Sequence, residues 1–142
     1  MRGEKQLLYE GGIRVPAIVC WKSRIKVDIT NSQVLCNIDI VPTLAKITGF
    51  EPLLDKKNID GIDISDVLFD QKAISRDLFW KFPVNNQRAF RRGDWKIYNN
   101  ELYNLRNDPG EKNNVAGENP LIYRELEAGW LKIDESAKPR NN

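Results

Sequence analysis

Reactive side chains are few in this sequence, and histidine is absent from all 142 residues. A Ser-His-Asp triad, a histidine-ligated zinc site and a histidine pH switch near neutrality therefore cannot come from this chain. The two cysteines, Cys20 and Cys36, are too few for a disulfide scaffold. Both stand among apolar neighbours, so we expect two buried free thiols.

A cluster of basic side chains stands between residues 88 and 96. It consists of Arg88, Arg91, Arg92 and Lys96, interleaved with Phe90 and Trp95. Such a cluster could contact an anionic ligand or a nucleic acid. Strand residues alternate between two faces, however, which would divide the charges, so the exposed face of a hairpin is the preferred interpretation. The net charge of +2 likewise does not favour a general nucleic-acid or anionic-membrane binder.

Four aspartates close together in the sequence could suggest a calcium loop. They are Asp55, Asp60, Asp63 and Asp66. The EF-hand spacing is absent, and so is its terminal glutamate. We therefore expect loop and capping residues, and we predict no metal ligands in this chain.

The first half of the chain is predicted to contain one buried strand and one helix. Residues 13–21 form a nearly continuous apolar run, typical of a strand covered on both faces. Asp39 is expected to cap a helix over 40–48, with Pro42 in its first turn and Gly49 just after its end. The apolar face of this helix is predicted to comprise Val41, Leu44, Ala45 and Thr48, with Ile40 and Ile47 beside it. Up to about residue 70 the pattern is that of the end of an α/β sheet domain.

The second half is predicted to form a small α+β unit. Four short strands are expected over 77–82, 87–92, 94–98 and 101–105, as an antiparallel meander. Asn99 and Asn100 suit a two-residue hairpin turn, because asparagine tolerates a positive φ. Asn119 is expected to cap a helix that begins at Pro120. Its apolar stripe, predicted to pack on the meander, comprises Ile122, Leu126, Trp130 and Ile133.

Composition fits a globular chain, with 41% apolar and 30% charged residues. No run approaches the ~18 apolar residues of a membrane-spanning helix. The first residues lack the long apolar stretch of a secretory signal, so none is expected there.

Several segments resemble, in order, motifs of the sulfatase family, in the arylsulfatase branch of the alkaline-phosphatase-like superfamily. The similar segments are Lys5 with Leu8–Ala17, Trp21–Ile25, Asp39–Leu44, Asp60–Asp63, Arg92–Lys96, Glu101–Leu105 and Asp108–Glu111. Each segment alone is modest evidence, but together they extend over nearly all of the chain.

The resemblance implies the C-terminal portion of such an enzyme. Residues 1–70 would be the C-terminal end of the α/β catalytic domain, and residues 71–142 the C-terminal α+β subdomain. The implied activity is hydrolysis of sulfate esters, with calcium and a formylglycine as cofactors. Their residues are absent from this chain, so the chain alone is expected to be inactive. A phosphonate or phosphate monoesterase of the same superfamily, or a non-catalytic module binding sulfated glycans, remains an alternative.

Lys5 is the catalytic and substrate-binding residue that the resemblance implies, since the family lysine contacts the sulfate. By spacing alone, a solvated lysine in a flexible arm would be the preferred interpretation of Lys5. Glu4 and Gln6 stand where the family commonly has glycine. Cys20 begins a C-x-K-S-R sequence close to the formylglycine motif, but Lys22 replaces the required proline or alanine, so Cys20 is not expected to be a nucleophile.

The segment around Glu10 is expected to support Lys5. Glu10 and Arg14 could form an ion pair, and Gly11 and Gly12 would permit backbone angles closed to other residues. The implied partners are a sulfated small molecule or glycan and the missing N-terminal part of the catalytic domain, with no nucleic acid and no membrane span. A periplasmic, extracellular or lysosomal location would suit the family.

Overall fold

The computed structural model describes residues 1–50 and 59–136. The chain divides into two compact units, one formed by Met1–Pro16 with Ser75–Asn142 and the other by Ala17–Ile74. We call them the sheet unit and the helical unit. The family's own domain boundary near residue 70 stays a prediction.

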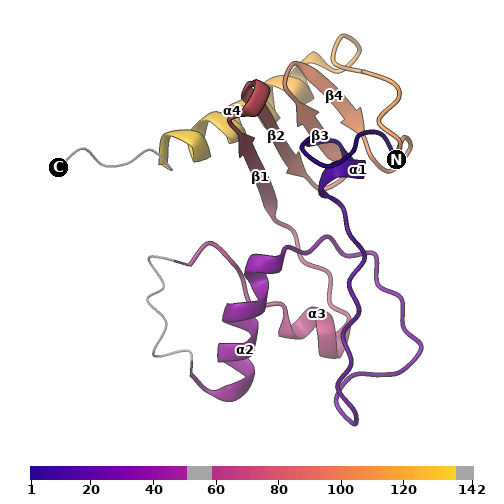
Figure 1. Cartoon of the computed structure of the whole chain (residues 1–142), viewed down its shortest axis with the longest axis vertical. Helices are drawn as coiled ribbons and strands as arrows, with labels where there is room; N and C mark the ends of the chain where they lie inside the picture. Colours follow the sequence, from indigo (N-terminus) through magenta and orange to yellow (C-terminus); the bar gives the residue numbers. More distant parts are fainter. Residues whose placement is uncertain (51–58, 137–142) are drawn as a thin grey trace, which may run out of the picture. The chain divides into compact units, whose positions relative to one another are not determined.

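The sheet unit contains the predicted four-stranded meander, which is confirmed (Figure 1). Its strands are β1 Asp77–Phe82, β2 Gln87–Arg92, β3 Trp95–Tyr98 and β4 Glu101–Asn104, in the order β1-β2-β3-β4, with a short 3-10 turn at Val84–Asn86 between β1 and β2. All three pairs are antiparallel. Gly93 and Asn99 occupy the last two hairpin turns with φ of +57° and +52°, as tight hairpins require.

Both faces of this sheet are covered, and because successive strand residues point to opposite sides, the strands contribute to two separate cores. Helix α4, Pro120–Ser136, covers one face as predicted. The core on that side consists of Phe90, Ile97, Leu102, Leu126 and Trp130. At the N-terminus of α4, the Asn119 carbonyl accepts the first helical hydrogen bond, from Tyr123 N–H at 3.0 Å, which confirms the N-cap position.

The N-terminal segment covers the other face, which the sequence did not predict. This second core consists of Leu8, Tyr9, Ala89, Tyr98, Tyr103 and Leu105. The segment includes α1, Glu10–Ile13, which lies beside the sheet in Figure 1. Residues near the start of the chain are therefore fixed by strands more than 80 positions later.

The predicted strand over 13–21 is wrong for this chain. Residues 14–21 have no regular structure, and Val15 and Ile18 are 79% and 96% exposed. A strand needs a hydrogen-bonded neighbour, and within residues 1–50 and 59–136 none pairs with this segment. Cys20 is accordingly exposed and Cys36 partly so, which corrects the expectation of two buried thiols.

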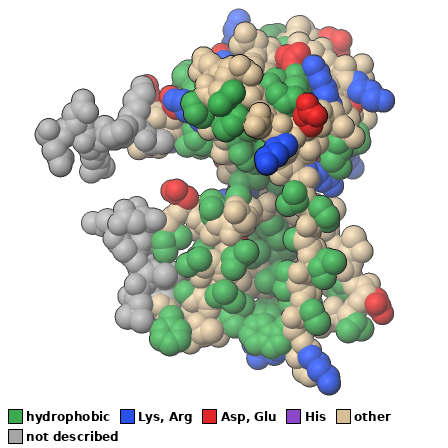
Figure 2. Space-filling model, viewed as in Figure 1, with side chains coloured by type: hydrophobic (Ala, Val, Ile, Leu, Met, Phe, Trp, Pro, Cys, Tyr) green, Lys and Arg blue, Asp and Glu red, His purple; other side chains and the backbone are tan. Residues whose placement is uncertain are grey.

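The helical unit contains a 3-10 turn at Asn37–Asp39, α2 over Ile40–Thr48 and α3 over Ser65–Asp70. Helix α2 ends as predicted at Gly49, whose φ is +76°. Its predicted apolar face is confirmed only at Ala45, because the other buried residues are Pro42 and Thr43. The remaining large apolar residues of the helix are mostly exposed, namely Ile40 (55%), Val41 (57%) and Leu44 (54%). Figure 2 shows such apolar side chains gathered on the visible face of this unit.

Asp39 joins two segments of the helical unit. Its buried carboxylate accepts hydrogen bonds from the backbone N–H groups of Cys36, at 2.8 Å, and Ile62, at 3.1 Å. Asp39 occupies the N-cap position of α2, as predicted, but its side chain does not cap the first-turn amides of this helix. Thr43 Oγ1 adds a second link by accepting from Ile64 N–H at 3.0 Å. The Asp39–Leu44 and Asp60–Asp63 segments, which the sulfatase resemblance singled out, thus lie together.

Within the part of the chain that the structure describes, no helix is long and apolar enough to cross a membrane.

Candidate functional site

Lys5 lies in an exposed turn of the sheet unit, where Leu7 N–H donates to the Glu4 carbonyl at 3.0 Å. Gln6, the third residue of this turn, has a φ of +79°. A type II turn requires a positive φ at this position, and glycine supplies it at least cost. The replacement of a family glycine by Gln6 therefore falls on a strained backbone position beside Lys5.

Gly11 and Gly12 allow the chain to pass closely over itself under this turn. A Cβ on Gly12 would lie 1.9 Å from the Leu7 carbonyl oxygen, and one on Gly11 would lie 2.5 Å from the Arg2 carbonyl oxygen. Neither glycine has a positive φ. The expectation of special backbone angles is therefore wrong, and close backbone packing is the reason for both glycines.

Replacing Gly12 with alanine is expected to destabilise the sheet unit by about 1–3 kcal/mol, because the added methyl group overlaps a backbone carbonyl that cannot rotate away. Urea unfolding followed by tryptophan fluorescence would measure the loss. Gly117→Ala is the matched control, since a Cβ there meets nothing within 4 Å. Equal midpoints for the two variants would contradict the packing argument.

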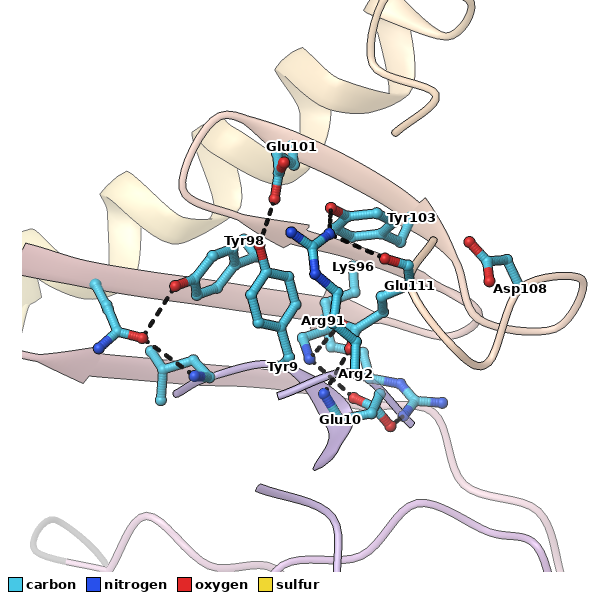
Figure 3. A network of polar contacts seen from close by, with 12 residues as sticks. Arg2, Tyr9, Glu10, Arg91, Lys96, Tyr98, Glu101, Tyr103, Asp108 and Glu111 are labelled. Atoms are coloured by element: carbon cyan, nitrogen blue, oxygen red, sulfur yellow. Dashed lines mark hydrogen bonds and ion pairs between the residues drawn. The ribbon is translucent and has the colours of Figure 1, made fainter. Parts of the chain in front are cut away.

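A buried ion-pair network holds α1 against the sheet (Figure 3). Lys96 is fully buried, and its Nζ lies 2.9 Å from Glu10 Oε1 and 2.8 Å from Glu111 Oε1. Arg91 Nη1 lies 3.4 Å from Glu10 Oε2. Two cations thus balance two carboxylates. The predicted partner of Glu10, Arg14, is wrong because Glu10 points into this network, and Lys96 is not on an exposed face.

Glu111 belongs to this network through both of its carboxylate oxygens. While Oε1 faces Lys96, Oε2 accepts a hydrogen bond from Glu10 N–H at 2.6 Å. The turn at Asp108–Glu111 presents this side chain, with Glu111 N–H donating to the Asp108 carbonyl at 3.1 Å. Segments that sequence analysis found separately around Glu10, Lys96 and Glu111 therefore meet in one buried site.

Arg2 and three tyrosines extend the contact between the N-terminal segment and the sheet. Tyr9 Oη donates to Glu101 Oε2 at 2.7 Å, and Arg2 Nη1 donates to Tyr103 Oη at 2.9 Å. The Arg2 guanidinium also lies 4.1 Å from the centre of the Tyr9 ring, which in turn packs on Tyr98. Sequence reasoning missed Arg2, because no motif or periodicity marks a partner so distant along the chain.

These tyrosines predict a loss of stability in alkali. Burial, and next the nearby Glu101, raises the pKa of Tyr103 to about 12, and burial also raises the pKa of Tyr9. The folded state therefore holds these protons where the unfolded chain releases them near pH 10. This stabilisation is complete below pH 10 and is lost as the pH rises toward 12, by about 2–3 kcal/mol for Tyr103.

Urea midpoints measured between pH 8 and 12 would test this dependence. Tyr103→Phe should show a shallower decline than the unsubstituted chain. An unchanged slope in that variant would contradict the assignment to Tyr103.

The basic cluster of β2 and β3 is matched by carboxylates. Arg88 pairs with Glu127 at 2.9 Å, and Arg92 pairs with Asp77 at 2.6 Å and with Glu125 at 2.9 Å. Together with the pairs of Arg91 and Lys96, every basic residue of the cluster has an acidic partner. The charges of the cluster are therefore compensated within the sheet unit.

Comparison with known proteins identifies the family. The sequence matches the family described as "N-sulphoglucosamine sulphohydrolase, C-terminal" over residues 3–130. The chain belongs to the sulfatases. It corresponds to their C-terminal part, as the ordered motifs predicted.

Curated relatives of this sulfatase chain include two bacterial proteins. It is 36% identical to a "Sulfatase" of Formosa agariphila, with 84% of this chain and 26% of the relative covered. It is 30% identical to the "N-acetylgalactosamine-6-O-sulfatase" of Bacteroides thetaiotaomicron, with 98% of this chain and 30% of the relative covered. The chain thus spans less than a third of the length of these relatives.

Solved structures agree with this assignment. A Bacteroides thetaiotaomicron structure, described in the context of glycosaminoglycan metabolism, matches 69% of the chain and 24% of that protein, with a TM-score of 0.53 and 27% identity. A Bacteroides fragilis protein matches 81% of the chain and 28% of its own length, with a TM-score of 0.63 and 19% identity, which supports the fold.

The residues present do not fit the calcium that the sulfatase resemblance implies. Asp63 accepts hydrogen bonds from Ser65 N–H and Oγ at the start of α3, and Asp66 pairs with Lys72. Asp55 lies outside the described residues. Across residues 1–50 and 59–136, no three His, Cys, Asp or Glu side chains are grouped so that they could hold a metal ion.

Proposed function

We propose that this chain is the C-terminal part of a sulfuric ester hydrolase, in which Lys5 contacts the sulfate group of the substrate. The observation that carries the proposal is the Lys5 turn, whose base is held by the buried Glu10, Lys96 and Glu111 network. Lys5 itself is exposed and so is available to an anion. A sulfated sugar is the substrate class we favour, because a relative that aligns with 98% of the chain is named for one.

In this role Lys5 stabilises negative charge. Cleavage of a sulfate ester concentrates charge on the sulfate oxygens and on the leaving oxygen. A fixed cation beside these oxygens lowers the barrier more than a mobile one, because it needs no reorganisation during the reaction. Calcium and a formylglycine nucleophile, which the family implies, would be held by residues outside this chain.

The helical unit supplies the surface on which we propose that the rest of the catalytic domain packs. Its apolar residues Ile18, Val41 and Leu44 are each more than half exposed, and no strand among the described residues pairs with residues 14–21. A sheet edge from the N-terminal part of the domain would pair with this segment and cover these side chains. The partner that covers this surface is thus the remaining part of the same catalytic domain.

The isolated chain is expected to show no turnover of 4-nitrophenyl sulfate in the presence of calcium. One well-placed charged donor contributes about 2.7–4 kcal/mol, whereas enzymes lower barriers by about 8–23 kcal/mol. Turnover by the pure chain that Lys5→Ala abolishes would overturn this expectation. A complete enzyme containing the chain should prefer the sulfate ester to 4-nitrophenyl phosphate, and the reverse preference would favour the phosphatase alternative.

A further inference from the structure

Both ends of the loop that carries Lys5 are held by the same residue, Glu111. At one end, Arg2 Nη1 donates to the Glu111 backbone carbonyl at 3.1 Å. At the other end, Glu10 N–H donates to Glu111 Oε2 at 2.6 Å. Residues 3–9, with Lys5 among them, run between these two contacts. We propose that Glu111 is a positioning residue that sets where the Lys5 ammonium group lies, an inference that rests on the proposed function of Lys5.

The loop is short and internally bonded, so a change at its base reaches the turn. Gly11 N–H donates to the Arg2 carbonyl at 2.8 Å, and Gly12 N–H donates to the Tyr9 carbonyl at 2.8 Å. The Glu4 and Leu7 carbonyls lie directly against Gly12. Displacement of α1 would therefore displace the Lys5 turn with it.

The carboxylate of Glu111 is held in one orientation. The side chain is fully buried, and Lys96 fixes the second oxygen at 2.8 Å. The backbone of Glu111 has a φ of +52°, a region in which glycine is less strained than glutamate. The fold accepts this strain because only a long acidic side chain at this place reaches both Lys96 and the Glu10 amide.

Accurate placement of Lys5 matters for its proposed chemistry. A misplacement of about 1 Å at a reacting centre can cost on the order of 100-fold in rate. Glu111 touches no substrate in this proposal and acts only through the position of Lys5. Removing the Glu111 carboxylate should therefore lower kcat only when Lys5 is present.

Amide hydrogen exchange and NMR on the full chain test the inference, with Glu111→Gln compared with Glu127→Gln. The two variants make the same chemical change, and Glu127 lies on α4, where it pairs with Arg88 of β2, far from this loop in the sequence. In Glu111→Gln the amides of Gly11 and Gly12 should exchange at least tenfold faster. The three-bond amide coupling that reports the positive φ of Gln6 should become averaged, while α4 amides change less than twofold.

Two outcomes would overturn the inference: unchanged protection of Gly11 and Gly12, or equal acceleration of all amides. If Glu111→Gln does not fold, Glu111→Asp replaces it, because aspartate keeps the charge but is one methylene too short for both contacts. A folded Glu111→Asp chain with an unchanged Gln6 signal would then overturn the inference.

A double-mutant cycle in a complete sulfatase containing the chain separates positioning from general stability. Glu111→Gln should lower kcat at least tenfold when Lys5 is present and less than twofold when Lys5 is already alanine. Equal losses in both backgrounds would overturn a positioning role. If Lys5→Ala itself leaves both kcat and KM unchanged, the proposed function fails, while the NMR experiment still tests separately whether Glu111 positions the turn.

Discussion

Replacing Lys96 with methionine is expected to destabilise the sheet unit by about 3–5 kcal/mol. Methionine has a similar volume, but it leaves the carboxylates of Glu10 and Glu111 buried without their shared cation. Removing one partner of a buried ion pair costs this much because the remaining charge keeps its desolvation penalty. Arg91, which lies 3.4 Å from Glu10, compensates only one of the two carboxylates.

Urea unfolding followed by circular dichroism would measure this loss. Lys81→Met is the matched control, because Lys81 is 51% exposed and pairs with Asp134 at the surface. The control should change the free energy of unfolding by less than about 1 kcal/mol. Similar losses in the two variants would show that the buried network does not hold the unit together.

Lys5→Ala is expected to lower kcat of a complete sulfatase containing this chain by about 10²–10³-fold. This is the effect of removing one preorganised donor from developing negative charge, about 2.7–4 kcal/mol. The free energy of unfolding should barely change, because Lys5 is exposed and lies at the tip of its turn. A large kinetic effect with a small effect on stability is the signature of a group that acts on the substrate.

Steady-state kinetics with an aryl sulfate would test this prediction. Lys112→Ala, another exposed lysine of the sheet unit, serves as the control and should keep nearly full activity. If both substitutions have the same effect, Lys5 contributes only general positive charge. A raised KM with unchanged kcat would assign Lys5 to substrate binding without transition-state stabilisation.

Local patterns predicted the sheet unit well, because each of its elements carries its own signal. Alternating residues marked the strands, Asn99 marked a hairpin turn, and Pro120 marked the start of α4. The stripe of Leu126 and Trp130 then identified the face that packs on the sheet. Such features depend on neighbours a few residues apart, so a single sequence contains them.

Contacts between distant segments could not be predicted in the same way. Glu10 had a plausible partner nearby in Arg14, but it pairs with Lys96, because the backbone brings α1 onto β3. Periodicity says nothing about which distant carboxylate faces which cation. The predictions made from the apolar residues at 13–21 and on α2 failed for another reason. Their composition indicates burial, but burial requires a covering surface.

The two hydrogen bonds that Glu111 makes with the ends of the Lys5 loop also determine when this loop can dock during protein synthesis. Glu10 N–H and the carboxylate that receives it are separated by 101 residues. A ribosome adding about 5–20 residues per second emits Glu111 roughly 5–20 s after Glu10. During that interval the nascent segment around Glu10 cannot yet form its hydrogen bond to Glu111, so this part of the segment remains accessible to chaperones and proteases. The Lys5 loop can therefore reach its final position only after Glu111 has been synthesised.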